Sequence, residues 1–255
     1  MKIAVLVKHV PDTYGERQLD PATRRADRTA GDQVIDEISE RAVEVALAHK
    51  DHEKSTEVVA VTMGPAQATD ALRKSLAMGA DRAIHVVDDA LTGADLMVTA
   101  TVLSAALRPE RFDLVIAGNE STDGRGGVLP ALLAEMLGLP LLSALRTVRL
   151  TDTEVSGARV TDAASTEVRA QLPAIISITE QLPDARFAGL RGIMAAKRKP
   201  MAKVGTADLG LEPPSSRTAV TSATALPRRT GGPRVEDDGT AAQQLADFLA
   251  DRHLI

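Results

Sequence analysis

Residues 57–87, EVVAVTMGPAQATDALRKSLAMGADRAIHVV, decide the fold class of this 255-residue chain. They begin with an apolar run, residues 57–63, which has the length and composition of a strand buried on both faces. A helical segment follows Gly64-Pro65 and reaches a natural stop at Gly79. A second apolar run at 83–87 predicts the next strand. Strand, helix and strand at this spacing imply a right-handed crossover and a parallel sheet.

The same alternation continues on both sides of this unit. Before it, residues 3–7 predict a strand, and apolar residues at helical spacing predict a helix with Asp36 or Ser39 as its N-cap. After it, the pattern predicts a helix at 94–107, a strand at 112–118 and a helix from 128 that ends near Gly138. We therefore predict an α/β fold: a mostly parallel twisted sheet flanked by helices, of the Rossmann-like type.

The pattern changes after residue 141. Alternating stretches predict antiparallel hairpins, and residues 174–179 predict one more core strand. Residues 201–238 form no periodic apolar face and contain prolines at 213, 214, 227 and 233, which is typical of an extended arm. An amphipathic helix follows, with Thr240 and Gln243 as a capping box. We expect two parts, an α/β domain at 1–200 and an arm with a terminal helix at 201–255.

Composition excludes several classes of function. A net charge of −5, 2% aromatic residues and no tryptophan argue against nucleic-acid binding. The absence of cysteine rules out thiolate catalysis, disulfides and Cys-ligated metals, and fits a reducing compartment. The first apolar run reaches Lys8 and His9 too soon for a signal peptide or a membrane span. We expect a soluble, cytoplasmic protein without membrane insertion.

One turn has the composition of a ligand site. Ligands of open parallel sheets bind at the carboxyl ends of the strands, where the sequence places GNESTDGRGG, residues 118–127. Its glycines permit close backbone approach, Arg125 adds a cation, and the helix that follows offers unpaired N–H groups to a phosphate. The turn matches neither the Walker A pattern nor GxGxxG, so a turn without ligand is the alternative. No metal-binding histidine spacing or nucleophile motif occurs, and we expect neither a metal site nor catalytic residues.

A second segment, PDARFAGLRGIMAAKRKP at 183–200, has no regular period. Four apolar residues lie in it between charged ones: Phe187, Leu190, Ile193 and Met194. The segment is either a poorly packed loop or a surface that a partner covers.

Five stretches, in this order, resemble the β subunit of electron transfer flavoproteins, the fourth in its actinobacterial form. They are KIAVLVKHVPDT (2–13), DEISERAVEVAL (36–47), VVAVTMGPAQATDALRKSLAMGADRAIHV (58–86), VIAGNESTDGRGGVLPALLAEMLGLP (115–140) and ARFAGLRGIMAAKRKP (185–200). The resemblance implies an electron carrier subunit, not an enzyme, that pairs with a homologous α subunit. FAD would be held mainly by the α subunit, and this chain would bury an AMP without a redox role.

The resemblance also implies partners and contact residues. Electrons would come from acyl-CoA and other dehydrogenases, as in fatty acid β-oxidation, and pass to a membrane quinone oxidoreductase. Relatives hold the AMP phosphate with Asn and Thr side chains. In this chain we expect glycine amides and Arg125 to hold it instead. The AMP contacts carried over by position are Leu6, Asp36, Glu37, Ile38, Ser39, Met63, Asp123, Gly124, Arg125, Gly126, Gly127, Val128 and Leu129.

For the segment 183–200 the resemblance implies a loop that recognises dehydrogenases. Leu190 would be its anchor, flanked by Phe187, Ile193 and Met194. The alternative is that Leu190 fills the chain's own core. The arm from residue 201 would wrap around the α subunit.

Two other functions remain open. Some electron transfer flavoproteins bifurcate electrons and carry a second FAD in place of AMP. The stretch TGADLMVTAT at 92–101 resembles their flavin loop at Gly93, Asp95 and Thr99, although Leu96 replaces a hydroxyl residue. The other alternative is a free-standing adenine-nucleotide-binding stress-type protein. An ATP-hydrolysing or adenylating enzyme of this fold class would need a pyrophosphate motif such as SGGxDS, which the sequence lacks.

Overall fold

The structure is a computed structural model that describes residues 1–15, 17–28, 31–212, 215–226, 231–232 and 234–255. The four prolines expected in the arm, at 213, 214, 227 and 233, lie outside the described residues. The chain divides into two compact units, Met1–Ala223 and Thr224–Ile255. The first holds the sheet, and the second contains helix α6 (Ala241–Asp251).

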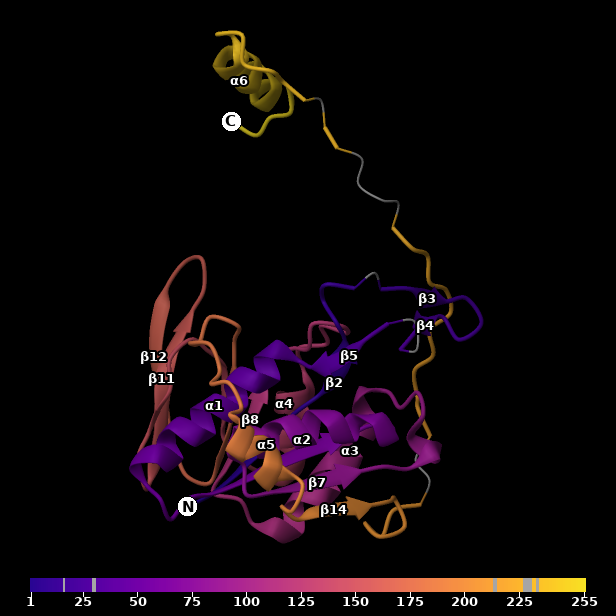
Figure 1. The fold of residues 1–255 in the computed structure, drawn as a ribbon, viewed down its shortest axis with the longest axis vertical. Helices are drawn as coiled ribbons and strands as arrows, with labels where there is room; N and C mark the ends of the chain where they lie inside the picture. The colour runs from indigo at the N-terminus through magenta and orange to yellow at the C-terminus, as the bar shows by residue number, and fades with distance from the viewer. Residues whose placement is uncertain (16, 29–30, 213–214, 227–230, 233) are drawn as a thin grey trace. The chain divides into compact units, whose positions relative to one another are not determined.

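Ten strands of the described chain form one sheet, in the order β10-β11-β9-β13-β8-β1-β6-β7-β14, with β12 beside β11. Figure 1 shows β11 and β12 side by side. The pairs from β9 through β14 are parallel, whereas β10, β11 and β12 pair antiparallel. The expected α/β fold is confirmed. The strands are β1 (Lys2–Leu6), β6 (Glu57–Met63), β7 (Arg82–Val86), β8 (Leu114–Gly118), β9 (Leu141–Leu145), β10 (Arg149–Leu150), β11 (Glu154–Val160), β12 (Ser165–Gln171), β13 (Ala174–Ile178) and β14 (Met201–Val204).

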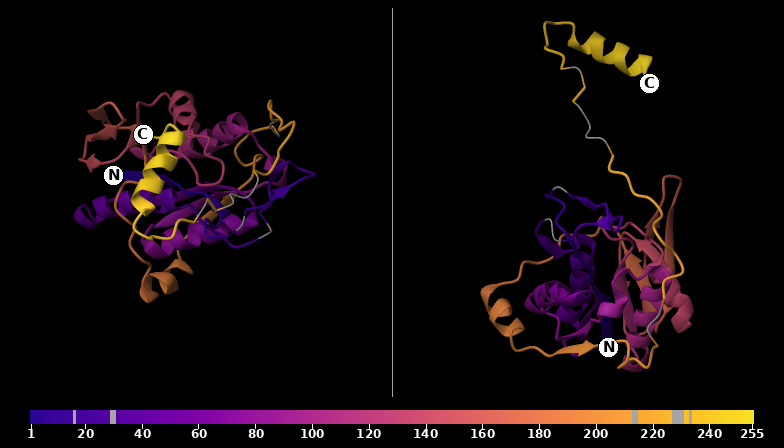
Figure 2. Two further views of the ribbon diagram at one scale, coloured as in Figure 1. Left: turned by 90° about the horizontal axis from the view of Figure 1, so that it is seen from above. Right: turned by 90° about the vertical axis from the view of Figure 1, so that its right-hand side faces the viewer.

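Both faces of the sheet are covered by helices, which is why its central strands are apolar throughout. Along and just after β1, Ile3, Val5 and Val7 belong to a core cluster that also contains α1, α2 and α5 residues. Ala4 and Leu6 point to the opposite cluster, with residues of α3 and α4. The two helical layers are visible in Figure 2. These helices are α1 (Glu37–His52), α2 (Thr69–Met78), α3 (Leu96–Leu107), α4 (Leu129–Leu137) and α5 (Leu190–Ala196), with 3-10 turns η1 (Ala66–Ala68), η2 (Asp89–Leu91) and η3 (Arg108–Glu110).

The strand order reverses between β1 and β8. From β1 the chain goes through β6 and β7 to one side, and β8, β13 and β9 then fill the other side. Crossovers on opposite faces of the sheet leave a crevice at such a reversal, beyond the carboxyl ends of the strands. The segments that follow β1 and β8 therefore meet at the expected ligand position.

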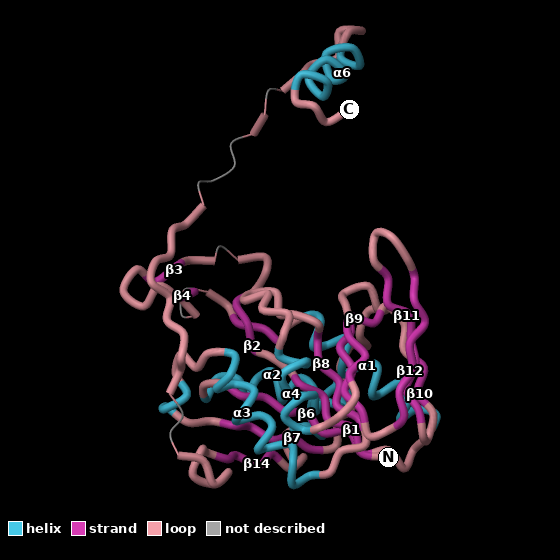
Figure 3. The backbone as a smooth tube through the Cα atoms, turned by 180° about the vertical axis from the view of Figure 1, so that it is seen from behind, coloured by secondary structure: helices cyan, strands magenta, loops and turns pink. Residues whose placement is uncertain are grey.

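An excursion separates β1 from α1. Two short antiparallel ribbons form there: β2 (His9–Pro11) pairs with β5 (Gln33–Ile35), and β3 (Leu19–Asp20) pairs with β4 (Arg25–Ala26). Figure 3 shows β3 and β4 close together. Residues 12–32, here called the flap, lie between β2 and β5.

Three features of the C-terminal third differ from expectation. Residues 190–196 form a helix, α5, which the sequence pattern did not predict. Only Ala196 of this helix is buried, so its apolar residues show no helical period. Residues 201–204 form edge strand β14 on β7, and the first compact unit continues to Ala223, so the sheet unit extends past the expected boundary at residue 200. The capping box of α6 is absent, since the Thr240 hydroxyl donates to Asp238 instead.

Candidate functional site

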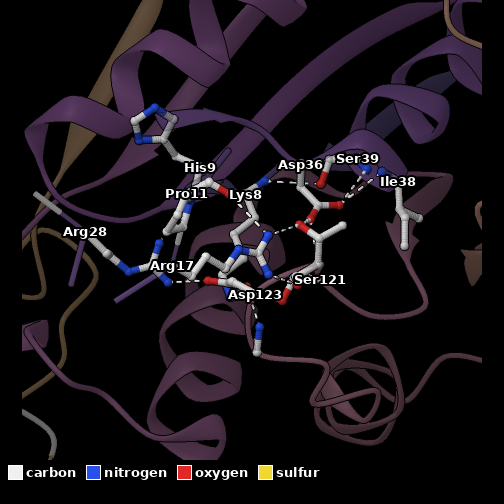
Figure 4. A network of polar contacts seen from close by, with 12 residues as sticks. Lys8, His9, Pro11, Arg17, Arg28, Asp36, Ile38, Ser39, Ser121 and Asp123 are labelled. Carbon is white, nitrogen blue, oxygen red and sulfur yellow. Dashed lines mark hydrogen bonds and ion pairs between the residues drawn. The ribbon is translucent and has the colours of Figure 1, made fainter. Parts of the chain in front are cut away.

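At the reversal of strand order, three distant segments converge (Figure 4). The Lys8 ammonium, just after β1, lies 3.0 Å from Ser121 Oγ and 2.7 Å from Asp123 Oδ1 in the glycine-rich turn that follows β8. The Lys8 backbone N–H donates to Ser39 Oγ at 3.3 Å, which adds the first turn of α1. Sequence position places Lys8 at this edge of the sheet but gave it no role in the site.

The buried carboxylate of Asp36 joins α1 to the same turn. Its Oδ1 accepts from the backbone N–H groups of Ile38 and Ser39 at 3.0 and 3.4 Å, so Asp36, one of the two expected caps, is the N-cap of α1. Its Oδ2 accepts from the backbone N–H and hydroxyl of Thr122 at 2.7 and 2.8 Å. The Asp36 side chain is thus committed to internal bonds that fix the turn relative to the helix.

Asp123 is the most strongly perturbed acid of this region. Burial alone would raise its pKa, but the Lys8 ammonium, the Ser121 hydroxyl and the Arg28 guanidinium outweigh that effect and hold the pKa far below its ordinary value. Only 4% of the Asp123 side chain is exposed, while about two fifths of the Lys8 and Arg28 side chains are. The carboxylate is therefore ionised and enclosed, and its two cations face solvent.

Two flap arginines reach the turn. Arg28 forms an ion pair with Asp123 and donates to the carbonyl oxygen of His9 at 3.1 Å. Arg17 donates to the carbonyl oxygen of Thr122 and to that of Pro11, the latter at 3.3 Å. Sequence analysis assigned no role to either arginine, because their approach to the turn depends on how β2 and β5 pair.

Helix α4 begins without a side-chain cap, which leaves the backbone N–H groups of its first turn, other than at Pro130, available to a ligand. Its N-cap residue, Val128, provides no side-chain cap, whereas Asp36 and Asp95 cap α1 and α3. Gly127 adopts φ +67°, in the left-handed region, and, its chain neighbours apart, no atom of the described residues lies within 4 Å of the position where a Cβ would stand. Exposed N–H groups at a helix start, beside a turn with free space, are suited to an anion.

Arg125 was expected to assist in holding a phosphate. Its backbone N–H donates to Ser121 O at 3.0 Å, with φ +47°. Within the described residues, its side chain has no hydrogen-bond or ion-pair partner. It is free to turn toward a ligand, whereas Lys8 and Arg28 are already held at the turn.

The other expected AMP contacts surround this turn in different ways. Leu6 is buried in the core, so only its main chain can reach the carboxyl edge. A Cβ at Gly118 would lie 3.0 Å from Ile38 Cγ2, so this close approach depends on the glycine. Met63 ends β6 half-buried, and Glu37 is exposed on the first turn of α1.

The loop before α3 is closed by other parts of the chain. A Cβ at Gly93 would overlap the Arg25 guanidinium, which donates to Gly93 O at 3.2 Å. The Asp95 carboxylate caps α3 by accepting a hydrogen bond from the backbone N–H of Val98 at 2.9 Å. It also accepts one from the backbone N–H of Arg217, in the arm, at 2.8 Å. The backbone N–H and hydroxyl of Thr218 also reach Asp95, both at 3.2 Å. The Thr99 hydroxyl donates back to Asp95 O at 2.8 Å.

Helix α5 presents an apolar surface. Phe187 is fully exposed, Leu190 is 82% exposed and Met194 is 61% exposed, with Ile193 beside them at 45%. The alternative that Leu190 fills the chain's own core is wrong. A shallow, open surface depression lies against this helix, lined by Leu190, Arg191, Met194, Ala195 and Arg198.

The segment is nevertheless firmly held. Before α5, the Arg186 guanidinium bonds Glu44 at 2.8 Å and Asp51 at 2.7 Å, and chiefly the Glu44 bonds raise its pKa. After α5, the Lys199 ammonium donates to Leu76 O at 2.9 Å and to Ala80 O, at the end of α2. The exposed apolar side chains are thus carried by an anchored element.

Within the described ranges, no group of three or more His, Asp or Glu side chains is arranged to hold a metal ion. No helix in the described part of the chain is long and apolar enough to cross a membrane.

Comparison with known proteins gives one consistent result. Residues 25–209 match the model of the electron transfer flavoprotein domain. The chain is 42% identical to the electron transfer flavoprotein subunit beta of Mycobacterium tuberculosis (strain H37Rv), and equally to that of Mycobacterium leprae, over 99% of each chain. It is 32% identical, over the full length of both chains, to a subunit of the caffeyl-CoA reductase–Etf complex, CarD, of Acetobacterium woodii.

Proposed function

The chain belongs to the electron transfer flavoprotein family, on the β-subunit side, and from this premise we propose that it holds one AMP as a structural ligand. The observation that carries the proposal is the glycine-rich turn at the carboxyl edge, with the uncapped start of α4 and open space at Gly127. Leu96 lies against Gly126, and the exposed Val128 follows, so apolar surface for a purine adjoins the place for a phosphate.

We place the FAD mainly in a homologous α subunit, with which this chain forms a heterodimer. When bound, that flavin supplies the electron-carrying chemistry. The contribution of this chain is to bind and position: the turn would hold AMP, and the arm with α6 would pack on the α subunit. In the second unit, Leu245 and Phe248 of α6 are exposed, which leaves an apolar face for such a contact.

The apolar surface of α5 is our proposed docking site for dehydrogenases. Leu190 is the anchor, and Phe187, Ile193 and Met194 surround it. Acyl-CoA dehydrogenases and related enzymes would deliver electrons there, and the complex would pass them to a membrane quinone oxidoreductase, as in fatty acid β-oxidation. The ion pairs of Arg186 hold this surface in position for binding.

The test is the nucleotide content of the complex. The chain is co-expressed with its α subunit, the heterodimer is purified, and released AMP and FAD are quantified. One AMP and one FAD per heterodimer support the proposal. A complex with neither nucleotide contradicts the proposed AMP site. A chain that elutes alone as a monomer contradicts the heterodimer and favours a free-standing adenine-nucleotide-binding protein.

A second candidate is a bifurcating subunit with a second FAD in place of AMP. It is favoured by the match at Gly93, Asp95 and Thr99 and by the 32% identity to the caffeyl-CoA reductase–Etf subunit. The internal bonds of all three residues weigh against it, because a flavin would have to displace the Asp95 contacts with the arm. Two FAD and no AMP in the same measurement would establish this candidate.

A further inference from the structure

Three cations approach the glycine-rich turn, and two of them share a single carboxylate. Lys8 and Arg28 both pair with Asp123. Arg17 lies beside them on the carbonyl oxygen of Thr122 (Figure 4). In the described part of the chain, none of the three has an ion pair with another carboxylate.

The second acid of the region does not balance this charge. The Asp36 carboxylate is occupied by the amides that begin α1 and by Thr122, and it has no ion pair with a described cation. Among the side chains bonded to one another or to the turn, three positive charges therefore face one carboxylate that is enclosed and one that is bound elsewhere. A local surplus of positive charge favours an anionic ligand.

Both arginines are oriented before any ligand binds. Arg28 is bonded to His9 O and Arg17 to Pro11 O, so each guanidinium is fixed to strand β2 by a carbonyl bond. Donors that are already oriented lose little conformational freedom on binding. The guanidinium fork also suits a phosphate, which accepts two parallel N–H bonds.

The cations lie over the turn itself. The Lys8 ammonium is 3.7 Å from the position that a Cβ at Gly124 would occupy, and the turn continues from there to the open space at Gly127. The α4 amides begin at this end of the turn without a side-chain cap. Ammonium, guanidinium and backbone N–H donors thus border one stretch of backbone.

We propose that Lys8, Arg17 and Arg28 form a phosphate subsite that distinguishes nucleoside monophosphates from nucleosides, with Asp123 competing for the same cations. This inference rests on the proposed AMP site and assigns its specificity to the flap. The flap is then part of the binding site.

The experiment compares AMP with adenosine, which lacks only the phosphate. The full chain in complex with its α subunit is depleted of nucleotide and titrated calorimetrically with each ligand. The variants are Lys8→Met, Arg28→Gln and Asp123→Asn. Arg24→Gln is the matched control, because Arg24 lies in the same flap but donates to Val220 O of the arm.

Loss of one charged contact is expected to weaken AMP about 10-fold to 100-fold in Lys8→Met and Arg28→Gln, while adenosine affinity stays unchanged. Asp123→Asn frees both cations and should raise the ratio of AMP to adenosine affinity. Arg24→Gln should leave both affinities as in the wild type. Added salt should weaken AMP and leave adenosine unaffected.

Arg28→Lys separates loss of charge from misfolding at this position. It keeps the positive charge that Arg28→Gln removes, and it should therefore retain most of the preference for AMP. If wild type prefers AMP but Lys8→Met and Arg28→Gln keep that preference, the subsite is wrong while the AMP site stands. If wild type binds neither ligand, the proposed function and this inference fail together.

Discussion

At the scale of single residues, two aspartates determine how the glycine-rich turn is held. Asp36 fixes it to the start of α1, and Asp123 fixes it to Lys8 and the flap. The first of these could be predicted, because an N-cap is a local property of the sequence. The role of Asp123 could not, because Lys8 and Arg28 reach it from 115 and 95 residues away.

We expect Asp123→Asn to lower the free energy of unfolding at neutral pH and to flatten its decline in acid. The Lys8 and Arg28 charges outweigh burial and depress the pKa of this carboxyl below the ordinary 3.8. A carboxyl whose pKa is depressed in the folded state contributes its full stabilisation at any pH well above its pKa in the unfolded state. This contribution is lost progressively as the pH falls below that unfolded-state pKa.

The measurement is urea unfolding of both proteins from neutral pH to below pH 3.8. Asp12→Asn is the control, since no ion pair joins Asp12 to a described cation. Equal acid slopes for wild type and Asp123→Asn would contradict the assigned ion pairs.

At the scale of elements, α5 is the part that sequence periodicity missed. A helix buried along one side shows an apolar period, but α5 buries only Ala196 and exposes its other apolar residues. It packs through a glycine instead: a Cβ at Gly192 would lie 2.2 Å from the carbonyl oxygen of Ala77 in α2. Strand β14 was missed for a related reason, since its four residues are exposed or half-buried at the sheet edge.

Gly192→Ala should lower the free energy of unfolding by about 1–3 kcal/mol, because the new methyl group collides with backbone that cannot rotate away. Gly189→Ala is the matched control, since no described residue other than its chain neighbours has an atom within 4 Å of its Cβ position. Guanidinium unfolding of the three proteins checks this. A Gly192→Ala variant as stable as Gly189→Ala would show that α5 does not pack on α2 at this point.

Leu190→Ala should weaken dehydrogenase docking by about 1–3 kcal/mol, the range of an interface hot spot, and leave the melting temperature unchanged. The reason is its 82% exposure, which leaves little core contact to lose. Electron transfer from an acyl-CoA dehydrogenase, measured as a function of carrier concentration, reports the docking. Leu19→Ala, on β3, is the control. If Leu190→Ala accepts electrons from the dehydrogenase at the same carrier concentrations as wild type, Leu190 is not the anchor.

At the scale of the whole molecule, the sheet was predictable and its boundary was not. Continuous apolar runs between helices specify a parallel sheet with both faces covered, and β1 shows this in its two core clusters. Strand order depends on contacts between distant segments and was not predicted. For the same reason, the sheet unit extends to Ala223 although periodicity is lost after residue 200.

Removal of residues 224–255 should leave the unfolding of the first unit unchanged and weaken binding to the α subunit. The described residues of this second unit bury no side chain of α6, so its apolar face is available to a partner. Thermal unfolding of the truncated chain and its affinity for the α subunit are the two measurements. Equal affinity of truncated and full-length chains would contradict the role of the arm.

The most direct test of the central claim is the AMP and FAD content of heterodimers that carry Gly127→Val or Gly210→Val. Both glycines have φ near +67° and open space at the Cβ position, so the two substitutions impose similar strain, but only Gly127 lies in the proposed AMP site. We predict one AMP and one FAD for wild type and Gly210→Val, and FAD without AMP for Gly127→Val. Full AMP content in Gly127→Val, or a second FAD in the wild type, would contradict the account.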